Sequence, residues 1–402
     1  MIQLFRPHMD EEEVQAVAEV IRSGWIGLGP KTAEFETAFA AFLGVPFAVG
    51  LNSATAALDM ALRLLDINHG DEVIVPAMTF VSTAHAVAYN LATPIFADVD
   101  PCTLAIDIDD VARRITPRTR AIIPVHYGGR PVAMDRLRQV AGTIPLIEDA
   151  AHACGAEYKG IKAGGLGDIA CFSFHAVKNL AMGDGGALIS RDRALTERAK
   201  RLRWLGIDRG TWDRTSADRS YWWRYYVDEI GLKCHMNDIM AAIGLVQLRK
   251  LASSNARRRQ IAEMYTACLQ DLPWLKTPVM DTSDSISAWH IYCIQAHGRD
   301  DLNVHLQERG VATGVHYSPI HLYACYGNRP HLPVAEALAG RILSLPMHPG
   351  LSDDDIHQVI DAIRAFHPPA SPAMVPGGRW SPLSASIRSR PRRRMEGGGS
   401  KS

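Results

Sequence analysis

The sequence predicts an α/β protein built around a mostly parallel β-sheet. Seven short apolar runs lie between residues 47 and 190, and several are continuously apolar, as in strands buried on both faces. Helix-like stretches separate many of these runs, and the alternation of strands with helices is typical of a parallel sheet. The chain has 402 residues, 47% of them hydrophobic, which is enough for two or three domains of ~150 residues with buried cores.

An amphipathic helix is expected at the start of the fold. Asp10 is its expected cap, Glu11–Glu13 suit the positive end of the helix dipole, and Val14, Val17 and Ile21 are the expected apolar face. The expected strands then follow in order, with helices expected at TAALDMALRLL (55–65) and in a segment ending near Tyr89. These strands are FAVGL (47–51), EVIVPA (72–77), PIFADVD (94–100), RAIIPVHY (120–127), PLIEDA (145–150), DIACFSF (168–174) and GALIS (186–190).

A smaller α+β domain is expected after this sheet. The pattern from Asn237 to about Leu272 indicates one long helix or a bent pair, which bridges the two domains. A final helix begins after Ser352, where Ser352 and Asp355 resemble a capping box. The other expected elements are a strand at AWHIYCIQA (288–296), a helix near 300–309 and a strand at VATGVHY (311–317).

These elements divide the chain into three expected parts. Residues 1–250 form the large domain, and residues 251–367 form the small C-terminal domain. Beyond Pro368 the composition turns to Pro, Gly, Ser and Arg, so we expect 368–402 to be a disordered basic tail.

Composition and charge exclude several classes of protein. Residues 371–402 hold seven basic residues and one acid, so the rest of a formally neutral chain is slightly acidic and a poor general binder of nucleic acid. Seven cysteines without a C-x-x-C pair indicate buried thiols in a reducing cytoplasm. The charge-free stretch from Val73 to Ala97 contains Pro76, His85, Asn90 and Pro94, so we expect strand, helix and strand rather than a membrane span.

Common catalytic motifs are absent from the sequence. There is no G-x-G-x-x-G after a strand, no phosphate-binding P-loop, no H-E-x-x-H and no G-x-S-x-G. His316 and His321 lie five residues apart, a poor spacing for one helix face, so we expect no metal site.

Polar residues at the ends of expected strands carry the remaining chemistry. Asp149 ends a strand, Ser53-Ala54-Thr55 lies between a strand and a helix, and Lys178 lies between a strand and a glycine-rich stretch. Each also has an ordinary explanation: an acid or a serine often caps a helix, and a lone lysine is nearly always solvated. Pyridoxal phosphate (PLP) would use all three, because it needs a lysine, an acid beside its pyridine nitrogen and an anion cradle.

Two runs carry a resemblance to a known family, IEDAAHACGAEYKG (147–160) and FSFHAVKNLAMGDGG (172–186). They resemble the DegT/StrS-type sugar aminotransferases, which are PLP enzymes of the aspartate aminotransferase fold, also called PLP fold type I. The likeness covers some nine tenths of the chain, and its details look most like the UDP-4-amino-4-deoxy-L-arabinose aminotransferase branch. Supporting runs lie at 23–45, 52–58 (NSATAAL), 71–87, 115–129 and 235–251 (HMNDIMAAIGLVQLRKL).

The resemblance implies a role for each matching residue. Lys178 matches the Schiff-base lysine and proton shuttle, and Asp149 matches the partner of the pyridine nitrogen. In relatives, an Asn from the other subunit completes the phosphate cradle; here His235 stands at that position, with Asn237 two residues on. The remaining matches are to cofactor-binding positions (Ala54, Thr55, Ala56, Phe80, His152 and Ser173) and to substrate-facing positions (His175, His316, Tyr317 and His321).

The implied activity is transfer of an amino group from L-glutamate to a keto group, at C4, of a nucleotide-linked sugar by a cytoplasmic homodimer. The resemblance implies no membrane or nucleic-acid partner. Three alternatives stay open: a keto-cyclitol or C3 keto-sugar aminotransferase, a sugar dehydratase, and a non-catalytic regulator with the basic tail as a nucleic-acid arm. Lys178 argues against the dehydratases, which carry His at that position.

Overall fold

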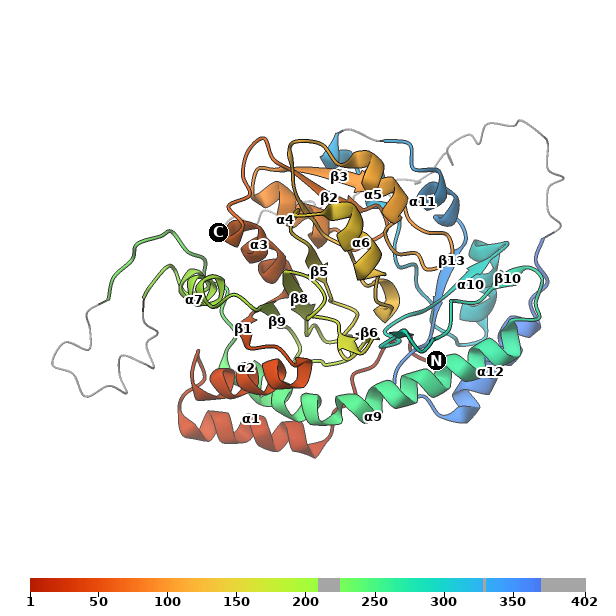
Figure 1. Cartoon of the computed structure of the whole chain (residues 1–402). Coiled ribbons are helices and arrows are strands. Elements are labelled where there is room, and N and C mark those ends of the chain that lie inside the picture. The colour runs from red at the N-terminus through yellow and green to blue at the C-terminus, as the bar shows by residue number, and fades with distance from the viewer. Residues whose placement is uncertain (209–224, 328–329, 370–402) are drawn as a thin grey trace, which may run out of the picture. The chain divides into compact units, whose positions relative to one another are not determined.

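The structure is a computed structural model, and it describes residues 1–208, 225–327 and 330–369 (Figure 1). Residues 1–368 form one compact unit. The expected disordered tail lies, from residue 370 on, outside the described residues. Within the described ranges, no helix combines the length and apolar character that a membrane crossing requires.

The centre of the fold is one seven-stranded sheet. A three-stranded and a four-stranded part are joined by parallel bridges from Ile122 to Leu146 and from Val125 to Asp149. Only the strand at Gly186–Ser190 runs antiparallel to its neighbours, so the expected mostly parallel sheet is confirmed. Across the sheet the strands are β3 (Thr93–Ala97), β2 (Glu72–Pro76), β4 (Thr119–Ile122), β5 (Ile147–Asp149), β8 (Ile169–Ser173), β9 (Gly186–Ser190) and β1 (Phe47–Leu51).

Helices cover both faces of this sheet (Figure 1). Alternate residues of β8 pack to opposite sides: Cys171 joins the core under α3, and Phe172 joins the core under α2 and α9. The helices are α1 (Glu11–Ser23), α2 (Pro30–Leu43), α3 (Ala54–Leu64), α4 (Ser82–Tyr89), α5 (Ile108–Arg114), α6 (Met134–Ala141), α7 (Arg193–Leu202), α9 (Asp238–Leu269), α10 (Arg299–Glu308), α11 (Pro333–Leu338) and α12 (Asp353–Arg364).

The expected capping of α1 is confirmed, but its expected apolar face is wrong. Asp10 and Glu13 form a capping box, as the sequence suggests. However, Val14 and Ile21 are more than half exposed, and the buried residues are Glu13 and Val20. The face toward α9 accepts the acidic Glu13 because Gln247 and Lys250 of α9 bind its carboxylate at 2.7 and 3.1 Å.

The long helix predicted after Asn237 is confirmed as the single 32-residue helix α9. Its first turn also anchors α2, because the carboxylate of Asp238 accepts the amides of Gly29, Lys31 and Thr32 at 2.9–3.0 Å. The domain boundary expected at residue 250 falls in the middle of α9, which contacts α1 and α2 near its start and α12 farther along.

The smaller half contains a second sheet, and one expected strand is missing from it. Its strands are β10 (Leu275–Lys276), β12 (Tyr292–Ala296) and β13 (Ile342–Leu345), all antiparallel. The strand expected at 311–317 does not form; Val311 and Gly314 make only isolated bridges. The position beside β12 is taken instead by β13, whose ILSL run was not singled out.

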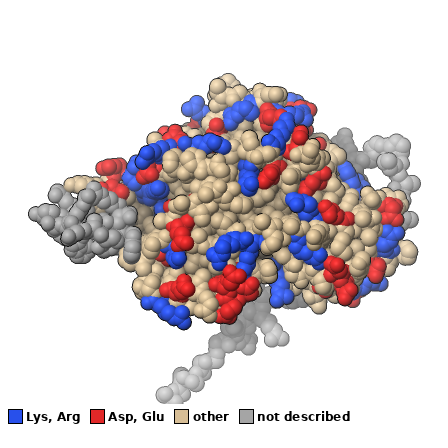
Figure 2. Space-filling view, turned by 60° about the horizontal axis from the view of Figure 1, so that its bottom comes forward, with Lys and Arg blue, Asp and Glu red and all other residues tan. Residues whose placement is uncertain are grey.

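A small third sheet connects the two halves. It consists of β6 (Glu157–Tyr158), β7 (Ile161–Lys162) and β11 (Ser285–Ile286). It fixes the start of the segment that leads through Ala288 to His290. On the face drawn in Figure 2, basic and acidic side chains are interspersed, with neither sign occupying a large area alone.

Candidate active site

The candidate site lies at the carboxyl edge of the large sheet. Asp149 ends β5 and Ser173 ends β8, the parallel strand beside it. Ser173 pairs with Gly186 of β9, and Gly186 pairs with Leu51 at the end of β1, just before α3. The sheet topology therefore brings together the ends of three strands, at Leu51, Asp149 and Ser173, which are widely separated in sequence.

Asp149 is a buried carboxylate with two hydrogen-bond donors. The Thr83 hydroxyl donates to Oδ2 at 2.8 Å, and the amide of Ala151 donates to Oδ1 at 3.2 Å. Burial raises the pKa of Asp149, whereas these hydrogen bonds and the positive charge of Lys178 lower it. The carboxylate is therefore held in a place where its charge interacts strongly with any cation beside it.

Lys178 lies in the loop between β8 and β9. Burial lowers the pKa of its ammonium to about 8, while the charge of Asp149 opposes that shift. Its Nζ lies 3.5 Å from Nε2 of His290. A lysine with this pKa has a sizeable neutral fraction near pH 7–8, which a nucleophile or a proton acceptor requires.

Aromatic rings line the site beside Lys178. The ring of His152 lies 4.6 Å from that of His290, and its Nε2 contacts the Tyr317 hydroxyl at 3.0 Å. Phe80, more than half exposed, lies 6.0 Å from the Tyr317 ring. Nδ1 of His152 is buried without a hydrogen-bond partner. It is therefore available to bind a polar group of a ligand in the site.

The start of α3 provides a place for an anion. Ser53 caps the helix and accepts the Ala56 amide at 3.1 Å, which leaves the amides of Ala54 and Thr55 available at the helix start. Gly186 packs directly against this turn. A Cβ at this position would lie only 2.3 Å from the Ser53 carbonyl carbon, so the close packing requires glycine. Ser173, at the end of β8, pairs with Gly186 of β9, so it lies at the same edge of the sheet as this turn.

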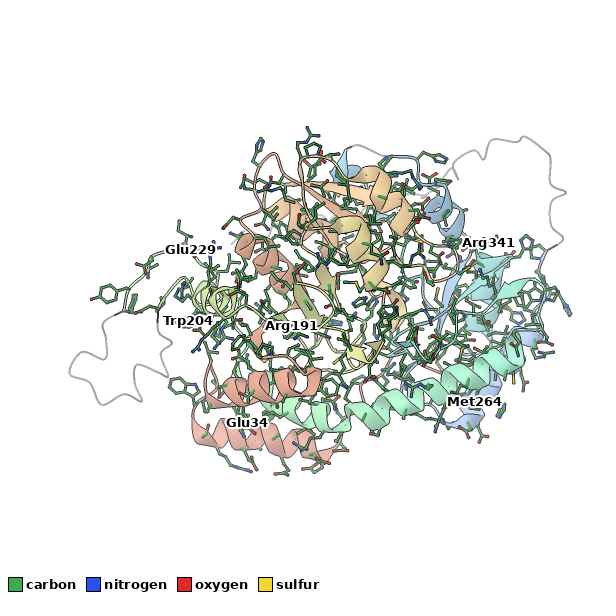
Figure 3. All side chains as sticks on the ribbon, in the orientation of Figure 1. Glu34, Arg191, Trp204, Glu229, Met264 and Arg341 are labelled. Atoms are coloured by element: carbon green, nitrogen blue, oxygen red, sulfur yellow. The ribbon has the colours of Figure 1, made fainter. Side chains whose placement is uncertain are left out.

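The two residues expected to act across a dimer lie in the segment that runs beside the carboxyl end of β1. His235 bridges to Leu51, and its ring lies 4.4 Å from that of Trp204, which Figure 3 shows beside α7. Burial lowers the pKa of His235 to about 4. The Asn237 side chain caps α9 by accepting the Met240 amide at 2.9 Å. Neither residue has a contact with Lys178 or Asp149 among the described parts of the chain, and both stay predictions.

The four positions expected to face substrate lie in different surroundings. His316 and Tyr317 join the site: burial and, after it, the charge of Lys178 lower the pKa of His316 to about 4, and Tyr317 contacts His152. His175 is exposed, and its backbone carbonyl accepts the Lys178 amide at 2.8 Å. His321 is fully buried and contacts Glu336 at 3.3 Å and the Phe96 ring at 6.3 Å.

Sequence reasoning missed several residues of this site. Thr83 lies within the supporting run at 71–87 and His290 within the strand expected at 288–296, but the sequence assigns neither residue a role. Asn179 follows Lys178 directly and contacts His290 at 3.1 Å. No spacing rule links residues 83, 149, 178 and 290, so only the folded arrangement reveals their proximity.

The site's residues fit PLP. A part-buried lysine with a lowered pKa, a buried carboxylate, aromatic rings and free amides at a helix start are the groups that its aldehyde, pyridine nitrogen, ring and phosphate require. The unpartnered Nδ1 of His152 adds a donor or acceptor for a ring substituent.

Comparison with known proteins gives the same assignment of fold. Residues 7–364 match the DegT/DnrJ/EryC1/StrS aminotransferase family. The chain is 41% identical over 372 residues to the spore coat polysaccharide biosynthesis protein SpsC of Bacillus subtilis, covering 89% of this chain and 95% of that protein. It is 40% identical over 367 residues to dTDP-4-dehydro-2,3,6-trideoxy-D-glucose 4-aminotransferase of Saccharopolyspora spinosa, covering 90% and 95%.

Solved structures match over similar lengths. The aminotransferase TlmJ of Streptoalloteichus hindustanus is 39% identical, with a TM-score of 0.86 and coverage of 91% of this chain and 98% of that one. Spr1654 of Streptococcus pneumoniae in its PLP form is 33% identical, with a TM-score of 0.83 and coverage of 90% and 97%.

Proposed function

Because the chain belongs to the DegT/DnrJ/EryC1/StrS aminotransferase family, whose members use PLP, we propose that it aminates the C4 keto group of a nucleotide-linked sugar with L-glutamate as donor. The observation that carries the proposal is Lys178, whose ammonium has a pKa lowered to about 8 by burial, although the charge of the buried Asp149 opposes that shift. PLP, when bound, supplies an electron sink for the charge left on a substrate carbon that loses a proton.

Lys178 holds the cofactor and moves the proton. Its Nζ alternates between a neutral and a protonated form, and a pKa near 8 makes both accessible at neutral pH. The ionised Asp149 stabilises a protonated pyridine nitrogen, because opposite charges attract strongly in a buried site. The Thr83 hydroxyl keeps the Asp149 carboxylate ionised by donating to it.

The remaining cofactor positions bind and orient. Phe80 would stack on the cofactor ring, and His152, whose Nδ1 has no partner, would bind the ring oxygen. The amides of Ala54 and Thr55, with the Ser173 hydroxyl, receive the phosphate at the positive end of the α3 dipole, and Ala56, whose amide donates to Ser53, lines the same turn.

A homodimer completes the proposed site. We assign His235 or Asn237 of a second copy to the phosphate, as the resemblance implies. Within one copy neither residue contacts the Lys178 group among residues the structure describes, which fits a role toward a neighbouring chain.

The keto sugar is proposed to face His175, His316 and Tyr317; His321, which the resemblance also implies, is fully buried against Glu336 and is not assigned to the sugar. The named activity of the Saccharopolyspora spinosa relative, a 4-aminotransferase acting on a dTDP-linked sugar, supports amination at C4. The resemblance to the UDP-4-amino-4-deoxy-L-arabinose branch instead favours a UDP-linked pentose. The two candidate substrates therefore differ in their nucleotide, dTDP or UDP.

A substrate panel tests the proposal. PLP-loaded protein and L-glutamate are supplied with UDP- and dTDP-linked 4-keto sugars, a nucleotide-linked 3-keto sugar and scyllo-inosose, and 2-oxoglutarate is measured. We expect turnover with a 4-keto nucleotide sugar at least tenfold above the other classes, which corresponds to ~1.4 kcal/mol of discrimination. Preferred turnover of the 3-keto sugar or the cyclitol would overturn the C4 assignment while leaving the aminotransferase class intact.

A further inference from the structure

A chain of buried polar side chains leads from the middle of α9 to Lys178. Asn255 of α9 contacts Asn179, Asn179 contacts His290, and His290 contacts Nζ of Lys178. Asn179, Asn255 and His290 are all less than 9% exposed. Polar groups buried this deeply are expected to be hydrogen-bonded in a defined direction.

Two backbone carbonyls fix that direction. The carbonyl oxygen of Cys154 can only accept, so the group that faces it at 2.9 Å is the amide NH₂ of Asn255. The carbonyl oxygen of Ala288 likewise faces the NH₂ of Asn179 at 2.6 Å. The oxygen of Asn255 therefore accepts from Asn179 at 2.8 Å, and the oxygen of Asn179 is the atom that faces His290.

The same logic assigns the tautomer of His290. Its Nδ1 lies 3.1 Å from the Asn179 oxygen, so Nδ1 carries the proton and donates it. In the neutral ring Nε2 is then unprotonated, and its lone pair faces Nζ of Lys178. The ring cannot turn freely, because it stacks on Phe5 at 5.4 Å and 9° and lies 4.6 Å from the ring of His152.

The backbone around His290 is equally fixed. The amides of Ala288 and Ile291 donate to the carbonyls of Gly129 and Gly128 at 3.0 and 3.1 Å. Gly129 has φ +99°, and a Cβ there would meet the Trp289 amide nitrogen at 2.9 Å and that of His290 at 3.1 Å. The position of the imidazole relative to Lys178 is therefore set from both sides.

We propose that His290, oriented by Asn179 and Asn255, is a positioning residue for Lys178, with its unprotonated Nε2 accepting a hydrogen bond from Nζ. This inference rests on the proposed role of Lys178. The bond holds Nζ in one place in both protonation states, since an ammonium and a neutral amine each have a hydrogen to donate. The free valences of Nζ are then directed away from His290.

His290 holds the proton on Nζ without taking it. Burial lowers the pKa of His290 well below its ordinary value, and the charges of Lys178, His152, Arg258 and His316 lower it further. Nε2 is therefore a good hydrogen-bond acceptor but a poor base. The proton stays on Lys178, where the proposed reaction uses it.

The proposal is tested in the cofactor-free full-length protein by the pH dependence of Lys178 acetylation. Trace acetic anhydride labels neutral amines, and mass spectrometry of the Lys178 peptide gives the midpoint. The groups that act on this midpoint are Asp149, which raises the pKa, and the burial of Nζ, which lowers it to about 8. His152, His290 and His316 are the other titratable groups in the field of Lys178.

Two substitutions of His290 separate the hydrogen bond from the shape of the ring. H290F keeps a ring between Phe5 and His152 but removes the acceptor, so we expect the midpoint to fall by about one pH unit, a tenfold change in the ionisation constant. H290Q retains an acceptor oxygen and should return most of that shift. H305F, a histidine-to-phenylalanine change on α10, is the matched control and should leave the midpoint unchanged.

The outcomes distinguish this proposal from the proposed function. A midpoint in H290F that equals or exceeds that of the unchanged protein overturns the positioning role. If H290F does not fold, histidine ¹⁵N chemical shifts of the unchanged protein decide, because the proposal requires the Nδ1–H tautomer at His290 and the Nε2–H tautomer contradicts it. Separately, PLP must protect Lys178 from acetylation; lack of protection would refute the role of Lys178 itself.

Discussion

The Thr83 hydroxyl donates a 2.8 Å hydrogen bond to Oδ2 of Asp149 across 66 residues of sequence. Asp149 can only accept when ionised, so the single hydrogen of Thr83 points to it, and the nearby Thr79 hydroxyl, at 2.9 Å, donates to Thr83. Burial raises the pKa of Asp149, and the hydrogen bonds from the Thr83 hydroxyl and the Ala151 amide oppose that shift. The negative charge of Asp149, which acts on Lys178, therefore depends on a hydroxyl that α4 supplies.

Thr83→Val should move the acidic limb of the pH–activity profile to higher pH. The substitution keeps the shape but removes a donor that lowers the pKa of Asp149, so the ionised form is populated only at higher pH. We expect a shift of about one unit in kcat/KM profiles. Thr37→Val, on the exposed side of α2, is the control; identical profiles for both variants would show that another group sets this limb.

Lys178→Ala should abolish transamination without unfolding the protein. The residue is proposed both to hold the cofactor and to move the proton, and loss of general acid–base catalysis alone costs ~10²–10⁴-fold in rate. Turnover and circular dichroism are measured side by side, with Lys200→Ala on α7 as the control. Appreciable activity in Lys178→Ala would refute the assignment.

Lys178→Met should stabilise the cofactor-free protein at neutral pH. The folded state lowers the pKa of Lys178 from 10.5 to about 8, so the unfolded chain binds the proton more tightly. Burying the protonated Lys178 therefore lowers the free energy of unfolding. This loss of stability is complete below pH 8 and disappears as pH rises through 10.5. We expect a gain of no more than ~3 kcal/mol in the free energy of unfolding at pH 7, shrinking at pH 10; a gain that does not depend on pH would contradict this origin.

Asp238→Asn should loosen the junction between α2 and α9. The carboxylate accepts three amides and the Thr32 hydroxyl, and an amide NH₂ in place of one oxygen would face a donor. We expect a loss of ~1–3 kcal/mol in urea denaturation. Asp353→Asn, at the exposed start of α12, should cost less than ~1 kcal/mol.

Mixing two inactive variants tests the proposed dimer. If His235 completes the partner's phosphate site, a heterodimer of Lys178→Ala and His235→Ala chains contains one intact site and one doubly defective site. Co-refolded mixtures should then recover up to about a quarter of the activity. A mixture no more active than its parts would show that the two residues serve the same chain; the same experiment with Asn237→Ala identifies which residue acts.

The large sheet was predictable because several of its strands are continuous apolar runs and helix-like stretches separate many of them. Other features depend on contacts that periodicity does not record. Glu13, which was expected only to suit the dipole of α1, is buried, because Gln247 and Lys250 bind its carboxylate. The run at 311–317 has strand-like composition, but β13 occupies the place beside β12.

The candidate site was partly predictable for a related reason. Lys178 and Asp149 follow apolar strands, and the runs around them carry the family resemblance. His290 and Thr83 come from other segments, and their roles arise from distances of 3.5 and 2.8 Å that only the fold creates.

The visible absorption spectrum of the protein with PLP tests the central claim most directly. We expect a yellow band of lysine-bound cofactor that bleaches when L-glutamate is added and returns when a 4-keto nucleotide sugar follows. A band that ignores glutamate would contradict the proposed donor. No band even with excess PLP would contradict the Lys178–Asp149 site itself.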